Sequence, residues 1–313
     1  MSDLLNSVIA RIESADPMHA KKLHKRMATM GADFFENAQR YYADCDEAMQ
    51  REGKSLAFGV ECYLKLCADM QTARLDFLRS GKYANTSYKE VAQAIYGRPE
   101  VMDYHMYGLA MAQFLWLDQY ERLRFFCDRL PSYRNSIRSY LEIGGGHGLY
   151  TRRALDILDP STRIDLLDIS ESSLKLAKSM INSPRVNYFL EDLFEWNGEE
   201  KFDFISIAEV IEHVEKPDAM LVRVRELLQP GGAVFLTTPV NAPMIDHIYL
   251  FRNVQEIRDL VAACGFAIVE DKYAISDDIS EEKAIKNKVP VMYAAFLRHA
   301  KRPDSMNTVS LAI

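Results

Sequence analysis

The sequence predicts an α/β fold in two parts, an all-helical N-terminal part followed by a doubly wound, seven-stranded and mostly parallel sheet. Three observations carry this prediction. Before about residue 135 glycine is sparse and apolar residues recur at helical spacing, and after it seven short apolar segments alternate with helical ones. Four glycines also stand within residues 144–148, directly after the first apolar segment. Strands and helices that alternate in this way form parallel sheets with helices on both faces.

The predicted boundaries follow the change of pattern near residue 135. We expect a helical cap, substrate or dimerisation domain over residues 1–134, a sheet domain over residues 135–300 and a flexible tail over residues 301–313. The helical part includes long stretches at about 55–79 and 100–130. The expected strands are 139–143, 163–168, 186–190, 202–208, 232–238, 266–272 and 290–297, and the helices between them are 150–157, 172–180, 220–228 and 254–264.

Composition and charge narrow the class of protein. The chain has 313 residues, 48% of them hydrophobic, and a formal net charge of −7, which disfavours broad electrostatic binding of nucleic acid or of an anionic membrane. The sequence has neither a signal-peptide pattern nor an apolar run near the ~20 residues of a membrane span. The five cysteines lack metal-site spacing and indicate free thiols. We therefore expect a cytoplasmic protein that acts on a small molecule.

Glycines and carboxylates stand at the ends of the first two strands, where parallel sheets bind their ligands. Glu142 precedes a loop in which Gly144, Gly146 and Gly148 allow a tight turn and a close approach of a ligand to the main chain. The second strand ends at Asp168, which is placed to accept hydrogen bonds from the hydroxyl groups of a ribose.

The third and fourth strands end in the same way. The third is followed by Asp192-Leu193, an acid that can accept from an exocyclic amine beside an apolar side chain that can cover a purine. The fourth is followed by a concentration of ionisable groups, Glu209, Glu212 and His213. Four such strand ends together predict a nucleotide-containing ligand.

These segments resemble the class I S-adenosylmethionine-dependent methyltransferases. The glycine loop, the run FDFISIAEVIEHV at 202–214 and the turn LLQPGG at 227–232 are similar to that family's motifs, and the resemblance covers about residues 137–298. It implies a Rossmann-like fold and S-adenosylmethionine as cofactor. The residues that would bind this cofactor are Glu142, Gly144, Gly146, Gly148, Asp168, Ile169, Asp192, Leu193 and Glu209. The GxGxG spacing differs from the GxGxxG of dinucleotide sites, which makes a dehydrogenase the weaker alternative.

Catalysis by such a protein requires positioning first and a base second. A sulfonium methyl group is already activated, so the protein has to hold a nucleophile in line with it and exclude water. A base is needed only if the nucleophile arrives protonated. We predict Glu212, His213 and His247 as the catalytic candidates, with Glu209 as a further candidate base.

The same residues suggest a metal site as the less favoured alternative. Glu209, Glu212, His213 and His247 are similar to the divalent-metal sites of two methyltransferase groups, the small-RNA 3′-end 2′-O-methyltransferases and the ubiquinone-pathway O-methyltransferases. Carboxylates with imidazoles suit manganese, iron or zinc better than magnesium. Because metal-free relatives also carry an EVIEHV-like motif, the main prediction has no metal.

The sequence does not identify the methyl acceptor. The residues predicted to line the acceptor pocket come from the aromatic helical stretch at about 100–130. Tyr104, Tyr107, Gln113 and Trp116 are the candidates, although aromatic residues at helical spacing also suit a simple core. The favoured function is methylation of a small metabolite at oxygen, nitrogen or sulfur. The alternatives are a metal-assisted O-methyltransferase acting on RNA or a quinone-type phenol, and a non-catalytic cofactor-binding partner. The helical domain could also form a homodimer.

Overall fold

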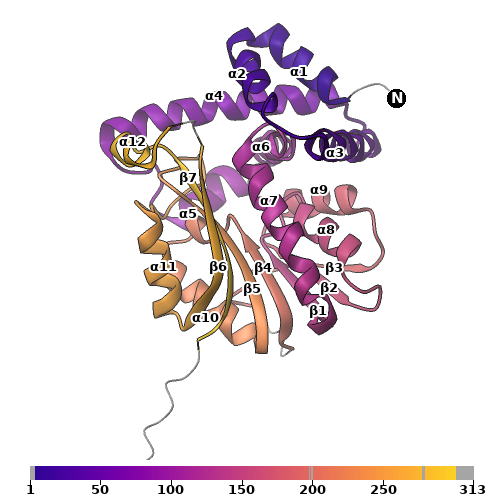
Figure 1. The fold of residues 1–313 in the computed structure, drawn as a ribbon, viewed down its shortest axis with the longest axis vertical. Coiled ribbons are helices and arrows are strands. Elements are labelled where there is room, and N and C mark those ends of the chain that lie inside the picture. The colour runs from indigo at the N-terminus through magenta and orange to yellow at the C-terminus, as the bar shows by residue number, and fades with distance from the viewer. Residues whose placement is uncertain (1–3, 197, 199, 277–278, 301–313) are drawn as a thin grey trace, which may run out of the picture.

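The computed structural model describes residues 4–196, 198, 200–276 and 279–300. The predicted flexible tail over residues 301–313 lies outside these residues. Figure 1 shows the first helices at one end of the molecule and the twisted sheet at the other.

The first part of the chain is helical, as its apolar spacing predicts. Its α-helices are α1 (Leu4–Ala15), α2 (Pro17–Met27), α3 (Ala32–Arg51), α4 (Leu56–Ser80), α5 (Tyr88–Val91), α6 (Pro99–Ala112) and α7 (Leu117–Arg129), with a π-helical turn at Ala92–Tyr96 and a 3₁₀ turn at Leu130–Ser136. Local sequence fixes several ends. Asp16 accepts a hydrogen bond from the His19 backbone N–H at the start of α2. Ser55 caps the start of α4, and Gly81 ends that helix at φ 71°.

The stretch at about 100–130 contains a bend that its apolar spacing does not predict. α6 ends at Ala112, α7 begins at Leu117, and the backbone of Trp116 between them is extended, with φ −103° and ψ 111°. The Trp116 indole N–H donates a hydrogen bond to the Tyr63 hydroxyl of α4, 3.1 Å away. This contact joins residues 53 positions apart. Tertiary packing therefore overrides local helical propensity at this point.

Seven strands form one sheet in the order β3-β2-β1-β4-β5-β7-β6. They are β1 (Ser139–Ile143), β2 (Arg163–Asp168), β3 (Val186–Leu190), β4 (Phe202–Ala208), β5 (Leu228–Val240), β6 (Phe266–Ile275) and β7 (Val291–His299). The first five strands run parallel, and β7 is antiparallel to both β5 and β6. The predicted mostly parallel, doubly wound sheet is confirmed.

Helices between the strands cover both faces of the sheet. They are α8 (Leu149–Ile157), α9 (Glu171–Ile181), α10 (Pro217–Leu227), α11 (Val254–Ala263) and α12 (Glu281–Lys286), with a 3₁₀ turn at Ile211–His213. α8 and α9 contribute to one apolar core and α10 and α11 to the other. The carboxyl ends of the parallel strands consequently stay uncovered by these helices and are available to a ligand.

The helical part and the sheet share the first of these cores. Phe125 and Phe126 of α7 pack on the sheet, with ring centroids 5.1 Å from Phe296 of β7 and 5.0 Å from Phe235 of β5, respectively. The same core extends to Leu5 of α1. The N-terminal helices are therefore held to the sheet by apolar packing and not by a linker alone.

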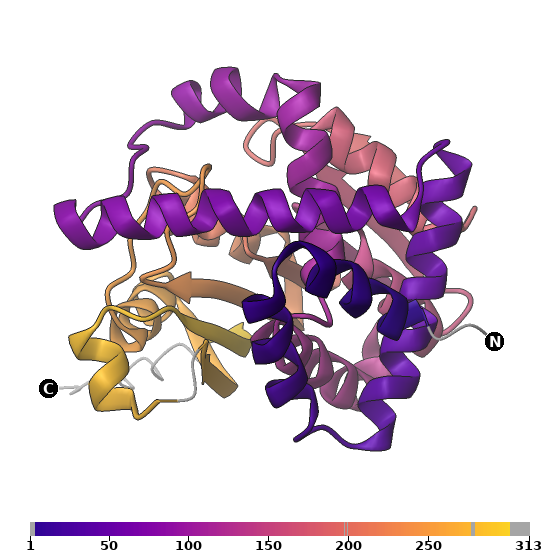
Figure 2. The same cartoon turned by 90° about the horizontal axis from the view of Figure 1, so that it is seen from above.

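The long helix α4 crosses the molecule above the sheet, as Figure 2 shows. Its residues and those of α2 and α6 face the strand ends across the cavity described below. Within the part of the chain that the structure describes, no helix has both the length and the apolar character that a membrane span needs.

Candidate active site

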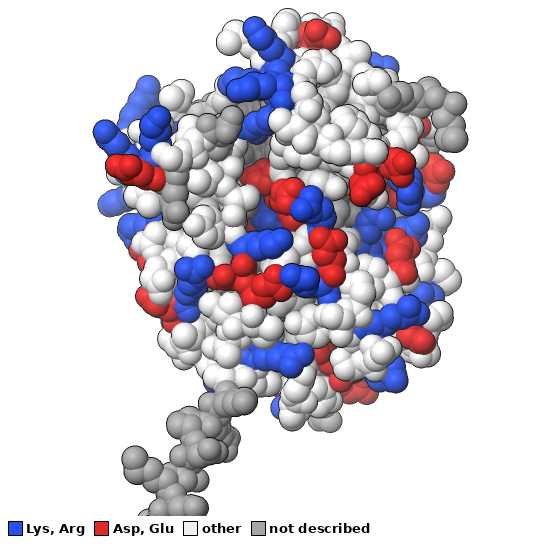
Figure 3. Space-filling view, in the orientation of Figure 1, with Lys and Arg blue, Asp and Glu red and all other residues white. Residues whose placement is uncertain are grey.

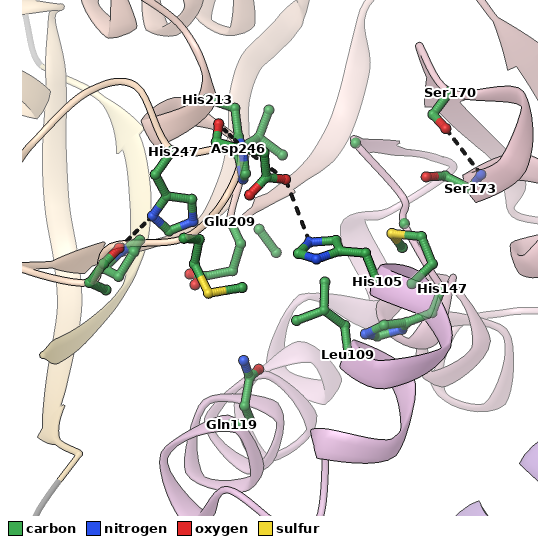
Figure 4. Close-up of a pocket in the computed structure, with 18 of the residues that line it drawn as sticks. His105, Leu109, Gln119, His147, Ser170, Ser173, Glu209, His213, Asp246 and His247 are labelled. Atoms are coloured by element: carbon green, nitrogen blue, oxygen red, sulfur yellow. Dashed lines mark hydrogen bonds and ion pairs between the residues drawn. The ribbon is translucent and has the colours of Figure 1, made fainter. Parts of the chain in front are cut away.

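A cavity of about 1220 Å³ lies between the carboxyl ends of the parallel strands and the N-terminal helices. The strand side is lined by the glycine loop and by the residues that follow β2, β3, β4 and β5. The helical side is lined by α2, α4 and α6, and Figure 4 shows part of this arrangement. The cavity lies at the edge of the sheet where doubly wound folds bind their ligands.

The glycine loop turns sharply from β1 into α8. Gly144, Gly146 and Gly148 have φ angles of 66°, 53° and 75°, which residues with a Cβ rarely adopt. A Cβ on Gly148 would lie 2.7 Å from Ile181 Cδ1, and one on Gly144 would overlap Val210 Cγ2. The Gly144 N–H donates to the Leu167 carbonyl, 2.8 Å away. Both the backbone conformation and the space around it therefore require glycine at these positions.

Glu142 is buried at the end of β1, with 2% of its surface exposed. Its carboxylate accepts a hydrogen bond from the Thr151 backbone N–H at 2.7 Å and another from the Thr151 hydroxyl. Burial raises the pKa of Glu142 to about 8, although the bonds from Thr151 act in the opposite direction. The side chain therefore favours a cationic ligand that would stabilise its ionised form.

Asp168 connects the end of β2 to the glycine loop. Its two carboxylate oxygens accept hydrogen bonds from the Gly146 N–H at 2.9 Å and the Ser170 N–H at 2.8 Å. Burial raises the pKa of Asp168, and these backbone N–H groups partly offset the effect. The carboxylate is thus fixed in orientation at the cavity edge, which suits recognition of a diol.

The ends of β2 and β3 together provide an apolar rim around a carboxylate. Ile169 and Phe194 line the cavity with 43% and 50% of their surfaces exposed, whereas Leu193 is buried. Asp192 also lines it and accepts a hydrogen bond from the Phe194 N–H at 2.8 Å. Apolar side chains beside an acid can cover a flat base and accept from its amine. The exposed Phe194 belongs to this rim and was not singled out from the sequence.

A cluster of imidazoles and carboxylates lies at the ends of β4 and β5. His213 Nδ1 lies 3.1 Å from the Asp246 carbonyl oxygen and 3.5 Å from its carboxylate. His247 Nδ1 lies 2.6 Å from the Ala242 carbonyl, and the rings of His213 and His247 have centroids 4.8 Å apart. Because a carbonyl only accepts, both Nδ1 atoms carry protons, and both Nε2 atoms carry lone pairs when the rings are neutral.

His213 and His247 differ in how this cluster shifts their pKa values. Burial lowers the pKa of His213, but the charges of Asp246 and Glu212 outweigh burial and raise it above its usual 6.5. Burial and the neighbouring His213 lower the pKa of His247 to about 3. Burial alone would raise the pKa of Asp246, but the surrounding histidines lower it to about 2. His213 is therefore the imidazole that gains a proton readily, and His247 stays neutral.

The helical part contributes two side chains to the same cluster. His105 of α6 is 2% exposed, and its Nε2 lies 3.6 Å from the Asp246 carboxylate. The Tyr96 hydroxyl lies 3.1 Å from His213 Nδ1. Figure 4 shows His105 reaching from its helix toward Asp246, with His213 on the other side. Asp246 is thus held between imidazoles that come from both parts of the chain.

Glu209, which is partly exposed, forms an ion pair with the buried Arg122 of α7. The Glu209 carboxylate also accepts a hydrogen bond from the Thr237 hydroxyl at 2.8 Å, and its backbone has a φ of 56°. Such a conformation is strained for a residue with a Cβ and is held by surrounding contacts. Glu209 is therefore fixed at the cavity edge by a guanidinium from the helical part.

Comparison with known proteins agrees with this geometry. Residues 141–234 match a family described as a methyltransferase domain. The malonyl-[acyl-carrier protein] O-methyltransferase 2 of Ilyobacter polytropus is 25% identical over 54% of this chain and 68% of its own length. The mitochondrial ubiquinone biosynthesis O-methyltransferase of Dictyostelium discoideum is 26% identical over 42% of this chain and 50% of its own length. These matches support a class I S-adenosylmethionine-dependent methyltransferase.

A solved methyltransferase supports the fold. The phosphoethanolamine N-methyltransferase 2 of Haemonchus contortus, in complex with S-adenosyl-L-methionine, has a TM-score of 0.52 and 15% identity and covers 70% of this chain and 61% of its own. At this identity the likeness shows the fold alone. The matched segments span between 33% and 84% of the length of the curated relatives, and 68%, 37% and 50% of the first three. The cofactor of this methyltransferase is S-adenosylmethionine.

The predicted acceptor wall of the methyltransferase needs correction. Gln113 and Trp116 line the cavity, and the Gln113 amide donates to the Gln119 carbonyl at 3.0 Å. Tyr104 and Tyr107 lie outside the lining. The Tyr104 hydroxyl donates to Asp69 at 2.7 Å. The Tyr107 ring packs on Phe58 of α4, with centroids 5.4 Å apart. Both tyrosines lie on faces of α6 that point to other helices and not to the strand ends.

Glu212 also differs from its predicted place. Its side chain is fully buried behind His213 and outside the cavity lining, and it accepts a hydrogen bond from the Thr238 hydroxyl at 2.9 Å. Its nearest oxygen lies 3.8 Å from His213 Nε2. Burial and the charge of Glu209 raise its pKa. Glu212 can therefore act on the acceptor only through His213.

Besides Phe194, four residues of the site were not predicted from the sequence, namely Tyr96, His105, Arg122 and Asp246. Asp246 directly precedes His247, and a carboxylate beside a candidate base was a signal that could have been used. Arg122 and His105 carry no such signal, because only tertiary packing brings them to the strand ends.

The candidate metal ligands are brought together only in part. Among the described residues, one nitrogen or oxygen atom from each of Glu212, His213 and His247 lies within 4.8 Å of the others. Glu209 is paired with Arg122 instead. The structure therefore offers three candidate ligands and not the four of the sequence-based alternative.

Proposed function

We propose that this methyltransferase transfers the methyl group of its cofactor to a hydroxyl oxygen of a small-molecule acceptor. The observation that carries the proposal is the pair formed by His213 and Asp246, which lines the cavity beside the cofactor-binding strand ends. A carboxylate that raises the pKa of an imidazole produces a base suited to a protonated nucleophile.

The strand ends fit S-adenosylmethionine. When bound, the cofactor supplies a methyl group on a positively charged sulfur, which makes it electrophilic without further activation. Glu142 would bind the amino end of the cofactor, since no cationic side chain among the described residues pairs with its buried carboxylate. Asp168 would accept from the ribose hydroxyls, and the rim of Ile169, Asp192 and Leu193 would surround the adenine.

His213 is the proposed general base. Its Nδ1 proton is held by the Asp246 carbonyl, which leaves Nε2 to accept the hydroxyl proton as the oxygen becomes nucleophilic. The imidazolium that forms is stabilised by the Asp246 carboxylate, 3.5 Å from Nδ1. His247 stays neutral and would orient the acceptor through its Nε2 lone pair.

The helices over the cavity would exclude water and orient the acceptor. α4 crosses above the strand ends, and Leu109 and Trp116 line the cavity on the helical side. Holding two reactants in line is the main contribution that a protein makes to an already activated transfer. The names of the relatives, O-methyltransferases in both curated cases reported above, also support an oxygen acceptor.

The proposal is tested by a panel of phenols, alcohols, thiols and amines incubated with cofactor that carries a tritiated methyl group. We expect label in a hydroxyl-bearing acceptor, with turnover that falls in Asp246→Asn while affinity for S-adenosylhomocysteine is kept. Label found only in amines or thiols, with equal turnover in Asp246→Asn, would contradict the proposal.

A metal-assisted O-methyltransferase is a second candidate, favoured by the convergence of Glu212, His213 and His247. A bound divalent ion would take the lone pairs that the proposed base uses, so the two mechanisms exclude one another. Turnover that is lost in EDTA and restored by manganese, iron or zinc would support the metal, whereas unchanged turnover supports His213 as base.

The small size of the acceptor and a homodimer are also proposals. A small-molecule acceptor is supported by the cavity between strand ends and helices and by the net charge of −7, which disfavours nucleic acid. A homodimer through the helical part is tested by light scattering of the eluted protein.

A further inference from the structure

A short segment connects α4 to α6 across the strand ends. It covers residues 82–98 and contains α5 and the π-helical turn at Ala92–Tyr96. π-Helical turns are rare and occur often at functional sites. The cofactor-binding roles proposed above involve no residue of this segment, yet two of its side chains, Tyr88 and Tyr96, line the cavity.

Hydrogen bonds tie this segment to the loops that follow β4 and β5. The Tyr88 backbone N–H donates to the Glu215 carboxylate at 2.7 Å. The Asn85 side-chain amide donates to the Ile245 carbonyl at 2.5 Å. These bonds join residues that are 127 and 160 positions apart in the chain. Contacts with the sheet loops, and not the neighbouring helices alone, therefore fix residues 82–98 over the strand ends.

The half-buried side chain of Tyr88 has two kinds of neighbour. Its ring centroid lies 6.2 Å from that of Tyr96, whose hydroxyl lies 3.1 Å from His213 Nδ1. Burial raises the pKa of Tyr88, and the charges of Asp192 and Asp168 act in the same direction. Because electrostatic effects fall off with distance, these two carboxylates lie near the Tyr88 hydroxyl. Tyr88 is therefore beside both the imidazole cluster and the acids at the ends of β2 and β3.

The ends of β2 and β3 add apolar side chains to this end of the cavity. Ile169, Leu193 and Phe194 line it from the strand side, and Tyr88 lines it from the helical side. Every base has a flat π face, and such faces stack favourably on aromatic rings. A base at the carboxyl ends of β2 and β3 therefore has an aromatic ring available from the helical part of the chain.

The charges at this end favour a base without a phosphate group. Asp168, Glu191, Asp192 and Glu215 line it, with Lys216 beside them. Four carboxylates against one ammonium group repel a phosphate. On the face of the molecule shown in Figure 3, acidic and basic side chains of the described residues are mixed, which does not favour a base that belongs to nucleic acid. An adenosyl group supplies a base and a diol without phosphate.

We propose that Tyr88 binds the adenosyl group of the cofactor. Its ring covers the adenosine from the helical side, while Asp168 and Asp192 hold the adenosine from the strand side. This inference rests on the cofactor-binding roles proposed for these two acids and is independent of the nature of the methyl acceptor. The segment 82–98 is then part of the cofactor site, and the helical part contributes to cofactor affinity.

The test compares two ligands by calorimetry, S-adenosylhomocysteine and 5′-methylthioadenosine, which keeps the adenosyl group but lacks the amino-acid end. Tyr88→Ala should weaken the binding of both ligands about tenfold, the low range for a base stacked on an aromatic ring. Tyr88→Phe keeps the ring and should stay within about threefold of the wild type. Weaker binding of S-adenosylhomocysteine alone would place Tyr88 at the amino-acid end and overturn the inference.

A matched variant and a second measurement support the test. Tyr249→Ala removes a tyrosine that is 36% exposed and outside the cavity lining, and it should leave both affinities unchanged. Amide hydrogen exchange of the wild type needs no substitution at all. Exchange within residues 82–98 should slow when 5′-methylthioadenosine is added, because the ligand holds Tyr88 in place. Exchange that stays the same with saturating ligand would contradict the proposed contact.

Comparison with Asp168→Asn separates this inference from the roles on which it rests. Normal binding of both ligands by Tyr88→Ala, with weaker binding by Asp168→Asn, would overturn the role of Tyr88 and leave that of Asp168 intact. The reverse pattern would support Tyr88 and refute Asp168. Normal binding by both variants would refute both roles. Neither ligand carries a methyl group for transfer, so every result is independent of the hydroxyl-acceptor assay.

Discussion

The strand wall and the helical wall of the cavity are built in different ways. On the strand wall, each functional group follows its own strand by a few residues, as Glu142 follows β1 and Asp168 ends β2. On the helical wall, His105 comes from α6 and Trp116 from the bend before α7, and both segments also contribute to the core. The comparison shows that the cofactor end is fixed by the regular sheet, whereas the acceptor end depends on how helices pack against it.

The sharpest way to separate the two walls is to remove the imidazoles. We expect His213→Ala to lower turnover about 10²–10⁴-fold, the usual contribution of a positioned acid or base, and His247→Ala to lower it by less, because His247 only orients the acceptor. Affinity for S-adenosylhomocysteine, measured by calorimetry, should stay within about twofold because the strand ends remain intact. His24→Ala, an exposed histidine of α2, is the matched control. Unchanged turnover in both variants would show that His213 and His247 take no part in the methyl transfer.

Substitution of Asp168 tests the strand wall in the same way. Asp168→Asn should weaken binding of S-adenosylhomocysteine about tenfold or more, since hydrogen bonds to a charged group contribute about 1.5–3 kcal/mol. Turnover at saturating cofactor should change little, because the variant leaves the imidazole cluster in place. A variant that binds the ligand as tightly as the wild type in calorimetry would show that Asp168 serves only to hold Gly146.

The pH dependence of cofactor binding tests Glu142. Its pKa of about 8 means that a proton is released when a cationic amine stabilises the carboxylate. Affinity for S-adenosylhomocysteine should therefore rise with pH by about tenfold per unit below pH 8 and then level off. Between pH 4.5 and 8 the folded state holds a proton that the unfolded chain has lost, so the free energy of unfolding should fall across the same window.

Glu142→Gln provides the control for this titration. The amide does not ionise, so the variant should bind more weakly at pH 8 and lose both pH trends. Calorimetry in buffers of different ionisation enthalpy counts the proton released by the wild type. A wild type that releases no proton, or a variant that keeps the trend, would assign the titration to another group.

The pH dependence of turnover tests Asp246. A base must be neutral to accept a proton, so turnover should increase as pH rises through the pKa of His213, which lies above 6.5. Asp246→Asn removes the carboxylate that raises this pKa, so the acidic limb of the profile should move to lower pH by about one unit. A limb that stays in place while the rate falls would indicate a structural role for Asp246.

The smallest expected effect separates two aromatic residues that the sequence predicted for the acceptor wall, of which only Trp116 lines the cavity. Trp116→Phe removes ring area at the cavity and the hydrogen bond to Tyr63, and it should raise the KM of the acceptor about threefold, the low range for one hydrogen bond. Tyr107→Phe should leave the KM unchanged, because Tyr107 packs on α4 outside the lining. An equal increase in the KM of the acceptor in Trp116→Phe and Tyr107→Phe would show that lining the cavity does not distinguish these two residues.

The sequence by itself determined the strand side of this methyltransferase. Strand ends are local features, and a glycine loop after an apolar run places Glu142, Gly144 and Asp168 at one edge as soon as the strands pair in parallel. The fold class follows from the same alternation. Glu209 is the partial exception, since its local position was predicted but its partner Arg122 was not.

Only the tertiary structure decided the acceptor side. Apolar spacing marks which residues of a helix are buried, but it does not say whether they face the sheet, another helix or a cavity. Tyr107 and Trp116 look alike in the sequence, but Tyr107 packs within α6 against α4, whereas the bend before α7 places Trp116 at the cavity. His105 lies beside Asp246 only through long-range packing, for which a single sequence has no local signal.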